Sequence, residues 1–188
     1  MQKYDVVLLV DALLSETDRK DVVTEFEKII KKNILTQDDM GLQQLAYNLG
    51  NKAWNNTAYV YSYYIQAETE DLELLKKNLL YNKAIKRYFI FKMEKTDDFV
   101  LFAKVNDELK AVIEWSEQKK LWQKVRFFAD KRNGKYLNRK SVVMLKKYIT
   151  RFGEIKPRAY TSNSVSTQKK LKTAILRARE LGFVAYKK

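Results

Sequence analysis

The side chains of this chain that could do chemistry are mainly cations, and they gather in its last third. Residues 126–188 hold 18 Lys+Arg and 3 Asp+Glu, whereas residues 1–100 hold 14 Lys+Arg and 16 Asp+Glu. The 188 residues carry a net charge of +14, so the last third accounts for the whole excess. Such a segment repels itself unless it meets an anion, and each neutralised phosphate releases condensed counterions. This pattern favours a polyphosphate partner, with an acidic membrane surface as the alternative.

The residue types that are missing exclude several classes of site. The chain has no cysteine and no histidine, which excludes disulfides, Cys/His zinc sites, iron–sulfur clusters and Ser-His-Asp triads. An enzyme using carboxylates or lysine stays open, but we expect no catalytic residues, no metal, no cofactor and no small-molecule substrate. We also expect no membrane span and no signal peptide, because no apolar run is long enough and the first residues lack the required layout.

Two predicted helices position the cations of the last third. The first runs from Arg139 to about Phe152, with Asn138 as its N-cap and Gly153 after its end. The second follows a Ser/Thr-rich segment at 161–167. At about 100° per residue, its apolar side comprises Leu171, Ala174, Ile175, Ala178 and Leu181, opposite the cations. We expect the apolar side to pack in a core, which would hold the basic side as a rigid array.

The first half of the chain predicts the order strand, helix, strand, strand, helix, strand. The strands are expected at Val6–Val10, near Leu42–Leu49, at Thr57–Ile65 and at Ile85–Met93. Ser15–Asp18 resembles a capping box before the first helix, and Thr69 begins the second. This β-α-β-β-α-β order is the split βαβ, or ferredoxin-like, pattern with both helices on one sheet face. The fold indicates no function by itself.

Tyrosines on the third strand leave two interpretations open. Tyr59, Tyr61 and Tyr63 share one face of the predicted strand. They could stack nucleobases, as aromatic residues do on sheets of RNA-recognition modules. We favour contacts with the core or with a protein partner.

Residues 97–126 contain neither glycine nor proline and predict a helix with a break near Trp115–Ser116. We interpret this segment as an ordered connector without a ligand. The predicted architecture is therefore α+β: a ferredoxin-like domain at 1–96, a helical connector at 97–126, and a small basic two-helix domain at 127–188 packed on the first.

Several short motifs in residues 134–186 are specific enough to indicate a protein family. The most specific are Tyr136-Leu137, Leu145–Ile149, Gly153–Arg158, Gln168–Leu171 and Ala174–Arg179. In these motifs the segment resembles the bacterial small-subunit ribosomal protein eighteen family. It departs from the family at Ala159, Ser162 and Ser166-Thr167, and it lacks the cysteine pairs of many members.

Residues 3–94 carry a weaker resemblance. The matching pieces are Tyr4-Asp5, Leu14–Glu16, Met40–Leu42 with Leu45–Tyr47, and Ala84–Tyr88. They are similar to the small-subunit ribosomal protein six family, whose fold is the ferredoxin-like sheet. The two families are separate chains in most bacteria and form a heterodimer on the platform, the central domain of small-subunit ribosomal RNA.

The resemblance implies a structural constituent of the small ribosomal subunit, located in the ribosome in the cytoplasm. The expected partners are small-subunit ribosomal RNA and neighbouring small-subunit ribosomal proteins. A regulatory protein that recognises a messenger RNA leader is the alternative.

On the RNA, we expect contacts with phosphates and groove shape rather than a base code. The candidate RNA-binding residues are Arg139, Lys140, Lys146, Lys147, Arg151, Lys156, Arg158, Lys169, Lys170, Lys172, Arg177 and Arg179.

Overall fold

The computed structural model describes residues 2–30, 33–48, 56–94, 99–118 and 126–186. It divides into two compact units, Met1–Phe99 and Val100–Lys188, which are treated separately below. The helix predicted as part of a connector belongs to the second unit. Among the described residues, no helix has the length and apolar character needed to cross a membrane.

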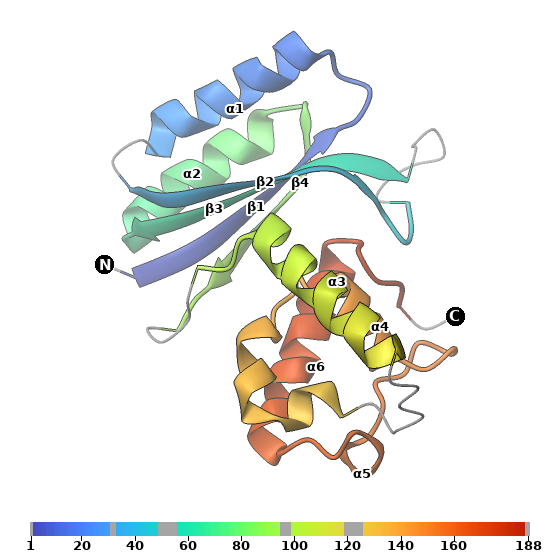
Figure 1. The fold of residues 1–188 in the computed structure, drawn as a ribbon. Coiled ribbons are helices and arrows are strands. Elements are labelled where there is room, and N and C mark those ends of the chain that lie inside the picture. The colour runs from blue at the N-terminus through green and yellow to red at the C-terminus, as the bar shows by residue number, and fades with distance from the viewer. Residues whose placement is uncertain (1, 31–32, 49–55, 95–98, 119–125, 187–188) are drawn as a thin grey trace. The chain divides into compact units, whose positions relative to one another are not determined.

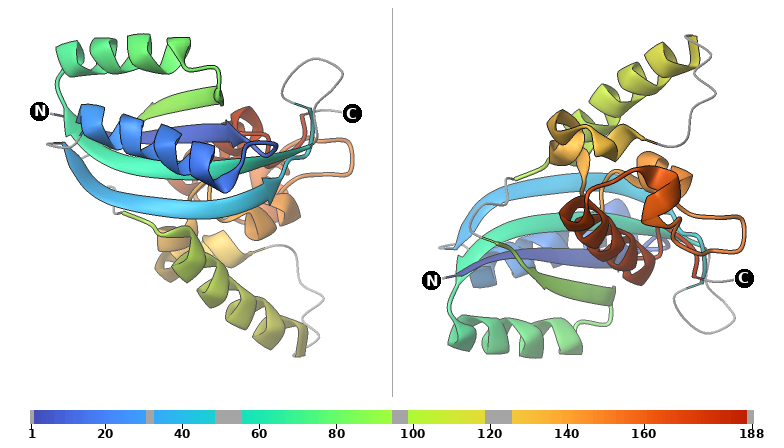
Figure 2. Two further views of the ribbon diagram at one scale, coloured as in Figure 1. Left: turned by 90° about the horizontal axis from the view of Figure 1, so that it is seen from above. Right: turned by 90° about the horizontal axis from the view of Figure 1, so that it is seen from below.

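In the described part of the first unit, a four-stranded antiparallel sheet has the order β2-β3-β1-β4. Its strands are β1 (Gln2–Asp11), β2 (Ile34–Gln44), β3 (Thr57–Ala67) and β4 (Ile85–Lys92). Helices α1 (Glu16–Ile30) and α2 (Thr69–Tyr81) follow β1 and β3 and lie on the same face of the sheet (Figure 1 and Figure 2). The predicted element order and the ferredoxin-like fold are confirmed.

The core of the first unit lies between the sheet and the two helices. In register, Val6 of β1 faces Tyr63 of β3, and Leu8 faces Tyr61. The Tyr63 ring centre lies 4.8 Å from that of Phe26 on α1. Since Tyr61 and Tyr63 are buried in this cluster, the core interpretation of these tyrosines is confirmed.

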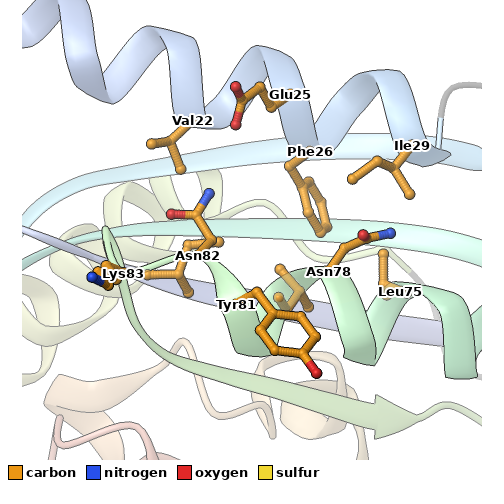
Figure 3. Close-up of a pocket in the computed structure, with 11 residues that line it drawn as sticks. Val22, Glu25, Phe26, Ile29, Leu75, Asn78, Tyr81, Asn82 and Lys83 are labelled. Carbon is orange, nitrogen blue, oxygen red and sulfur yellow. The ribbon is translucent and has the colours of Figure 1, made fainter.

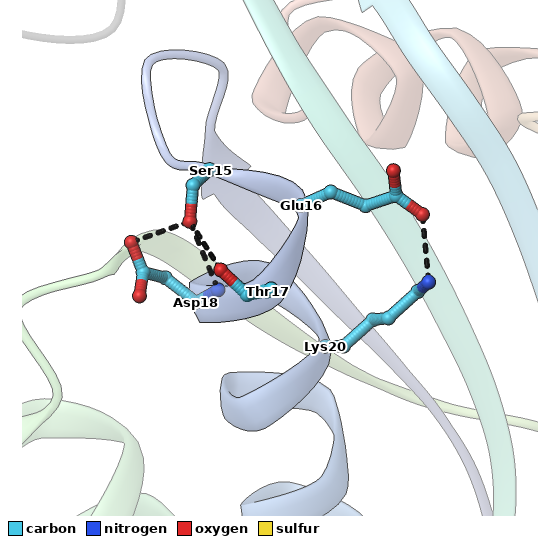
Figure 4. Close-up of polar contacts among 5 residues, drawn as sticks. All are labelled: Ser15, Glu16, Thr17, Asp18 and Lys20. Atoms are coloured by element: carbon cyan, nitrogen blue, oxygen red, sulfur yellow. Dashed lines mark hydrogen bonds and ion pairs between the residues drawn. The ribbon is translucent and has the colours of Figure 1, made fainter.

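Ser15 begins α1 as its N-cap (Figure 4). Its Oγ accepts a hydrogen bond from the backbone N–H of Asp18 at 3.2 Å, and its hydroxyl donates to the Asp18 carboxylate at 2.7 Å. In the first turn, Lys20 forms an ion pair with Glu16 at 2.7 Å. The predicted cap is present. It is not a full capping box, because the Asp18 carboxylate accepts from the Ser15 hydroxyl and not from the Ser15 backbone N–H.

Strand β2 lies earlier in the chain than expected. The strand covers Ile34–Gln44, so the prediction near Leu42–Leu49 is confirmed at Leu42–Gln44 and wrong at residues 45–48, while Leu49 lies outside the described residues. β2 is an edge strand, and most of its residues are at least partly exposed. Its polar run Gln37–Asp39 therefore weakened the apolar alternation that identifies a strand.

Gly41 lies where the register of β2 against β3 shifts, with a φ of +66°. We expect Gly41→Ala to lower the free energy of unfolding by about 1–2 kcal/mol, because a Cβ disfavours this left-handed conformation. A Cβ at Gly41 would meet nothing within 4 Å, so the cost comes from the backbone. Gly134→Ala is the matched control: it also has open space but no positive φ. Urea denaturation compares the two variants, and equal losses would contradict the prediction.

The second unit is helical. Its elements are α3 (Phe102–Gln118), the 3-10 turns η1 (Phe127–Ala129) and η2 (Lys131–Tyr136), α4 (Val142–Lys147), α5 (Arg158–Thr161) and α6 (Val165–Glu180). α3 continues through Trp115–Ser116, so the predicted break there is wrong. α6 matches its prediction: Ser164 Oγ accepts from the Thr167 N–H at 3.1 Å, and Gly182 follows the helix with a φ of +83°.

The helix predicted at Arg139–Phe152 is wrong at both ends, because α4 covers only Val142–Lys147. Before it, the Asn138 side chain accepts from the Lys140 N–H and forms a turn. After it, the β-branched Ile149 pairs with Ile155 in an antiparallel bridge. These bonds use backbone groups that a longer helix would need.

Candidate nucleic-acid interface

The second unit, hereafter the basic unit because it contains the cation-rich residues 126–188, has an apolar core that positions its surface side chains. The α6 residues predicted to form an apolar side are all buried, and that expectation is confirmed. From outside α6, Leu145, Tyr148 and Phe128 are also buried. The Phe128 N–H donates to the Tyr148 hydroxyl at 2.9 Å, and the two ring centres lie 5.1 Å apart.

Burial raises the pKa of Tyr148 to about 12, although the Phe128 N–H that the hydroxyl accepts acts in the opposite direction. In the unfolded chain a tyrosine ionises near pH 10. Stability from the buried neutral phenol is therefore complete below pH 10 and is lost between about pH 10 and 12. We expect Tyr148→Phe to be less stable than the parent at pH 8, because Phe128 loses its acceptor. Urea denaturation at pH 8 and pH 11 should show this difference shrinking at the higher pH; a constant difference would contradict the prediction.

Residues 149–155, hereafter the 149–155 hairpin, form a tight turn after α4. The Ile149–Ile155 bridge closes it. Within it, the Thr150 N–H donates to the Glu154 carbonyl at 2.8 Å and the Gly153 N–H donates to the Thr150 carbonyl at 3.0 Å. Gly153 has a φ of +83°, which glycine adopts without strain. Arg151 and Phe152 therefore lie at the turn of this hairpin.

Gln168 on α6 orders the loop at residues 156–163, which connects the 149–155 hairpin to α6. Its amide nitrogen donates to the Lys156 carbonyl at 2.9 Å. Its amide oxygen accepts from the Thr161 hydroxyl at 3.2 Å and from the Asn163 amide at 3.0 Å. One side chain thus fixes both ends of the segment that carries Arg158.

Nine of the twelve candidate cations reach the surface of the chain. Six are exposed: Lys146, Arg151, Arg158, Lys169, Lys170 and Lys172. Three are half-buried: Lys147, Lys156 and Arg177. Within the last group, the Lys156 ammonium donates to the Lys147 carbonyl at 2.8 Å, which places a cation at the negative end of α4.

The other three candidates, Arg139, Lys140 and Arg179, are buried. The Lys140 ammonium donates to the Val100 carbonyl at 2.8 Å. The Arg179 guanidinium donates to the carbonyls of Gly153 and Ala185. Buried charges require such partners, and breaking these bonds to reach a ligand would be costly. We therefore leave these three residues out of the candidate interface.

Within residues 126–186, four further exposed cations were not among the candidates predicted from the sequence. They are Arg126, Lys131, Arg132 and Lys135. Lys135 lies 3.3 Å from the Glu108 carboxylate on α3, which also accepts from the Tyr136 hydroxyl. These two bonds hold the pKa of Glu108 below its usual value. The high density of positive charge in this segment could have identified these cations from the sequence. Helical periodicity could not, because the short 3-10 turns η1 and η2 have no repeat that separates a basic face from an apolar one.

A separate pocket of about 520 Å³ lies between α1 and α2 of the first unit (Figure 3). Apolar side chains such as Phe26, Ile29 and Leu75 line it together with the polar Glu25, Asn78 and Lys83. None of the candidate cations contributes to it. Across the described residues, no group of three or more His, Cys, Asp or Glu is placed to hold a metal.

Comparison with family models divides the chain as the motifs do. Residues 3–92 match ribosomal protein S6, and residues 133–184 match ribosomal protein S18. Both resemblances inferred from the sequence are confirmed.

The sequences of the bS18 and bS6 relatives support the same division. Small ribosomal subunit protein bS18 of Mycoplasma capricolum subsp. capricolum is 44% identical over 64 residues, covering 34% of this chain and 84% of the relative. Small ribosomal subunit protein bS6 of Phocaeicola vulgatus is 28% identical over 98 residues, covering 50% of this chain and 83% of the relative. The crystal structure of 30S ribosomal protein S6 from Thermotoga maritima has 22% identity and a TM-score of 0.45, covering 59% of this chain and 97% of that one.

Proposed function

Because the chain belongs to the ribosomal protein S18 family and its first half to the ribosomal protein S6 family, we propose that it binds the central domain of small-subunit ribosomal RNA. Membership itself implies a structural role in the small ribosomal subunit. The proposal adds the RNA target. It also adds that this single chain replaces two proteins that most bacteria make as separate chains.

The observation that carries the proposal is the separation of charge from core in the basic unit. On α6, the apolar side is buried while Lys169, Lys170 and Lys172 are exposed. Exposed lysines on a rigid helix can approach several phosphates at once without ordering a flexible segment first. Each contact releases a counterion, which favours a polyanion as the ligand.

The nearly neutral first unit contributes little to this electrostatic attraction. We assign it to contacts with neighbouring small-subunit ribosomal proteins, in the ribosome of the cytoplasm. Carrying both regions on one chain lets the RNA-binding region and the protein-binding region reach the ribosomal subunit in a single encounter. For a short linker, the effective concentration of the second region is on the order of millimolar once the first has bound.

Binding to a central-domain fragment of the ribosomal RNA, beside a scrambled RNA of equal length, tests the proposal. A salt series should give a falling affinity for both RNAs because phosphate contacts are lost. We expect the true fragment to keep a large advantage at about 0.2 M salt, where non-specific binding has weakened. If the two affinities fall together, the basic unit is a general polyanion binder and the proposed target is wrong.

A further inference from the structure

Phe152 is a large aromatic side chain in an unusual place for one. It is 59% exposed and lies at the turn of the 149–155 hairpin. The neighbouring Arg151 is exposed too, and its guanidinium carbon lies 4.6 Å from the centre of the Phe152 ring. Because the side chain remains 59% exposed beside this guanidinium, ring surface is left for a further ligand.

The backbone beneath Phe152 is fixed on both sides. Two hydrogen bonds connect Thr150 with Gly153 and Glu154, and the Glu154 N–H also donates to the Thr150 hydroxyl at 3.0 Å. The buried Arg179 guanidinium donates to the Gly153 carbonyl, which ties the hairpin to α6. An aromatic ring on a fixed turn loses little conformational freedom when a flat ligand stacks on it, which favours binding.

The surroundings of the ring select the class of ligand. Residues 126–188 carry 18 Lys+Arg and 3 Asp+Glu, so an anionic ligand is attracted and a cationic one repelled. A nucleotide of RNA meets both requirements, because it joins a flat base to an anionic phosphate. Aromatic side chains and arginine planes stack unpaired bases of RNA, whereas bases within a duplex are already stacked on their neighbours.

We propose that Phe152 stacks an unpaired nucleobase of the bound RNA while Arg151 contacts the adjoining phosphate. This inference rests on the proposed RNA-binding function and adds one contact that is not purely electrostatic. It adds a base contact to the expected phosphate and groove-shape recognition, although stacking does not read a base code.

The test compares the parent protein with Phe152→Leu on three RNAs. These are the central-domain fragment, the scrambled RNA and a blunt RNA duplex without unpaired bases. On the first two, we expect Phe152→Leu to bind about tenfold more weakly, since the unpaired base loses the aromatic ring on which it stacks. The slope of affinity against salt should stay the same, because no charge is removed. On the duplex, the two proteins should bind equally.

Two further variants make the result specific. Phe152→Trp keeps a stacking surface and should bind at least as tightly as the parent. Tyr81→Leu removes an aromatic that is 80% exposed in the nearly neutral first unit, and it should leave all three affinities unchanged.

Equal binding of the parent and Phe152→Leu to the two partly unpaired RNAs would overturn the inference. An equal loss on the duplex would overturn it as well, since that loss would come from the fold of the hairpin. The proposed function has a different failure: the parent would then show no preference for the central-domain fragment. In that case the scrambled RNA still reports on stacking.

Discussion

Replacing Lys169, Lys170 and Lys172 together by alanine is expected to weaken binding to the central-domain RNA by on the order of a hundredfold near 0.1 M salt. All three are exposed on α6, opposite its buried side. Each lysine that contacts a phosphate releases about one counterion, so the log–log slope of affinity against salt should become less steep by about two to three. Filter binding across a salt series measures both quantities.

The matched control removes the same charge from the other unit. Lys76, Lys77 and Lys83 are exposed near the end of α2 and just after it, in the region of the chain that is nearly neutral. Replacing them by alanine should change the affinity by less than about threefold at the same salt. If both triple variants lost affinity equally, the loss would reflect net charge rather than an RNA contact on α6.

Arg179→Met is expected to lower the free energy of unfolding by about 2–4 kcal/mol. The substitution keeps an unbranched apolar stem but removes the donors for the Gly153 and Ala185 carbonyls. A buried carbonyl left without its donor costs about 1–3 kcal/mol. The Gly153 carbonyl is buried and the Ala185 carbonyl is partly buried, so the second loss is the smaller one. Urea denaturation measures the total, and hydrogen exchange in residues 149–186 shows where protection is lost.

Lys172→Met serves as the control on the same helix, because Lys172 is exposed. Its stability should stay within about 0.5 kcal/mol of the parent, as for other surface substitutions. Arg179→Lys keeps the charge but not the two-carbonyl geometry, so it should recover only part of the loss. Full stability of Arg179→Met would show that these two hydrogen bonds contribute nothing.

Sequence predicts a helix or strand well when the residues that pack in the core recur at the spacing of that element. α2 was predicted well because Leu72, Leu75 and Leu79 have the helical spacing and all face the core. β1 was equally clear as a run of buried apolar residues. The edge strand β2 was misplaced because one of its sides has no neighbouring strand, so its polar residues do not alternate cleanly.

The helix predicted at 139–152 failed for a different reason. Its apolar spacing is real, since Leu145 and Tyr148 are buried. What ends α4 early are contacts from residues beyond it: Lys156 donates to the carbonyls of Lys147 and Tyr148, and Ile149 pairs with Ile155. Spacing within one segment cannot reveal such competitors for its backbone groups.

The site was predicted as a surface but not residue by residue. Helical spacing separated Lys169, Lys170 and Lys172 from the core of α6. Arg179 was grouped with these cations, but it is buried and donates to the Gly153 and Ala185 carbonyls, contacts that helical spacing cannot reveal. Lys140 was placed on a helix that does not form there, so its burial could not be foreseen.

The order of strands in the sheet has a consequence for how this protein is made. β1 lies inside the sheet between β3 and β4, and its Tyr4 pairs with Lys92. A ribosome adding about 5–20 residues per second needs roughly 4–16 s to proceed from the end of β1 to the end of β4. During that interval the apolar run Val6–Val10 has emerged without its final partner. Nascent chains of this protein are thus exposed to aggregation for several seconds, and a chaperone that binds short apolar strands would protect them.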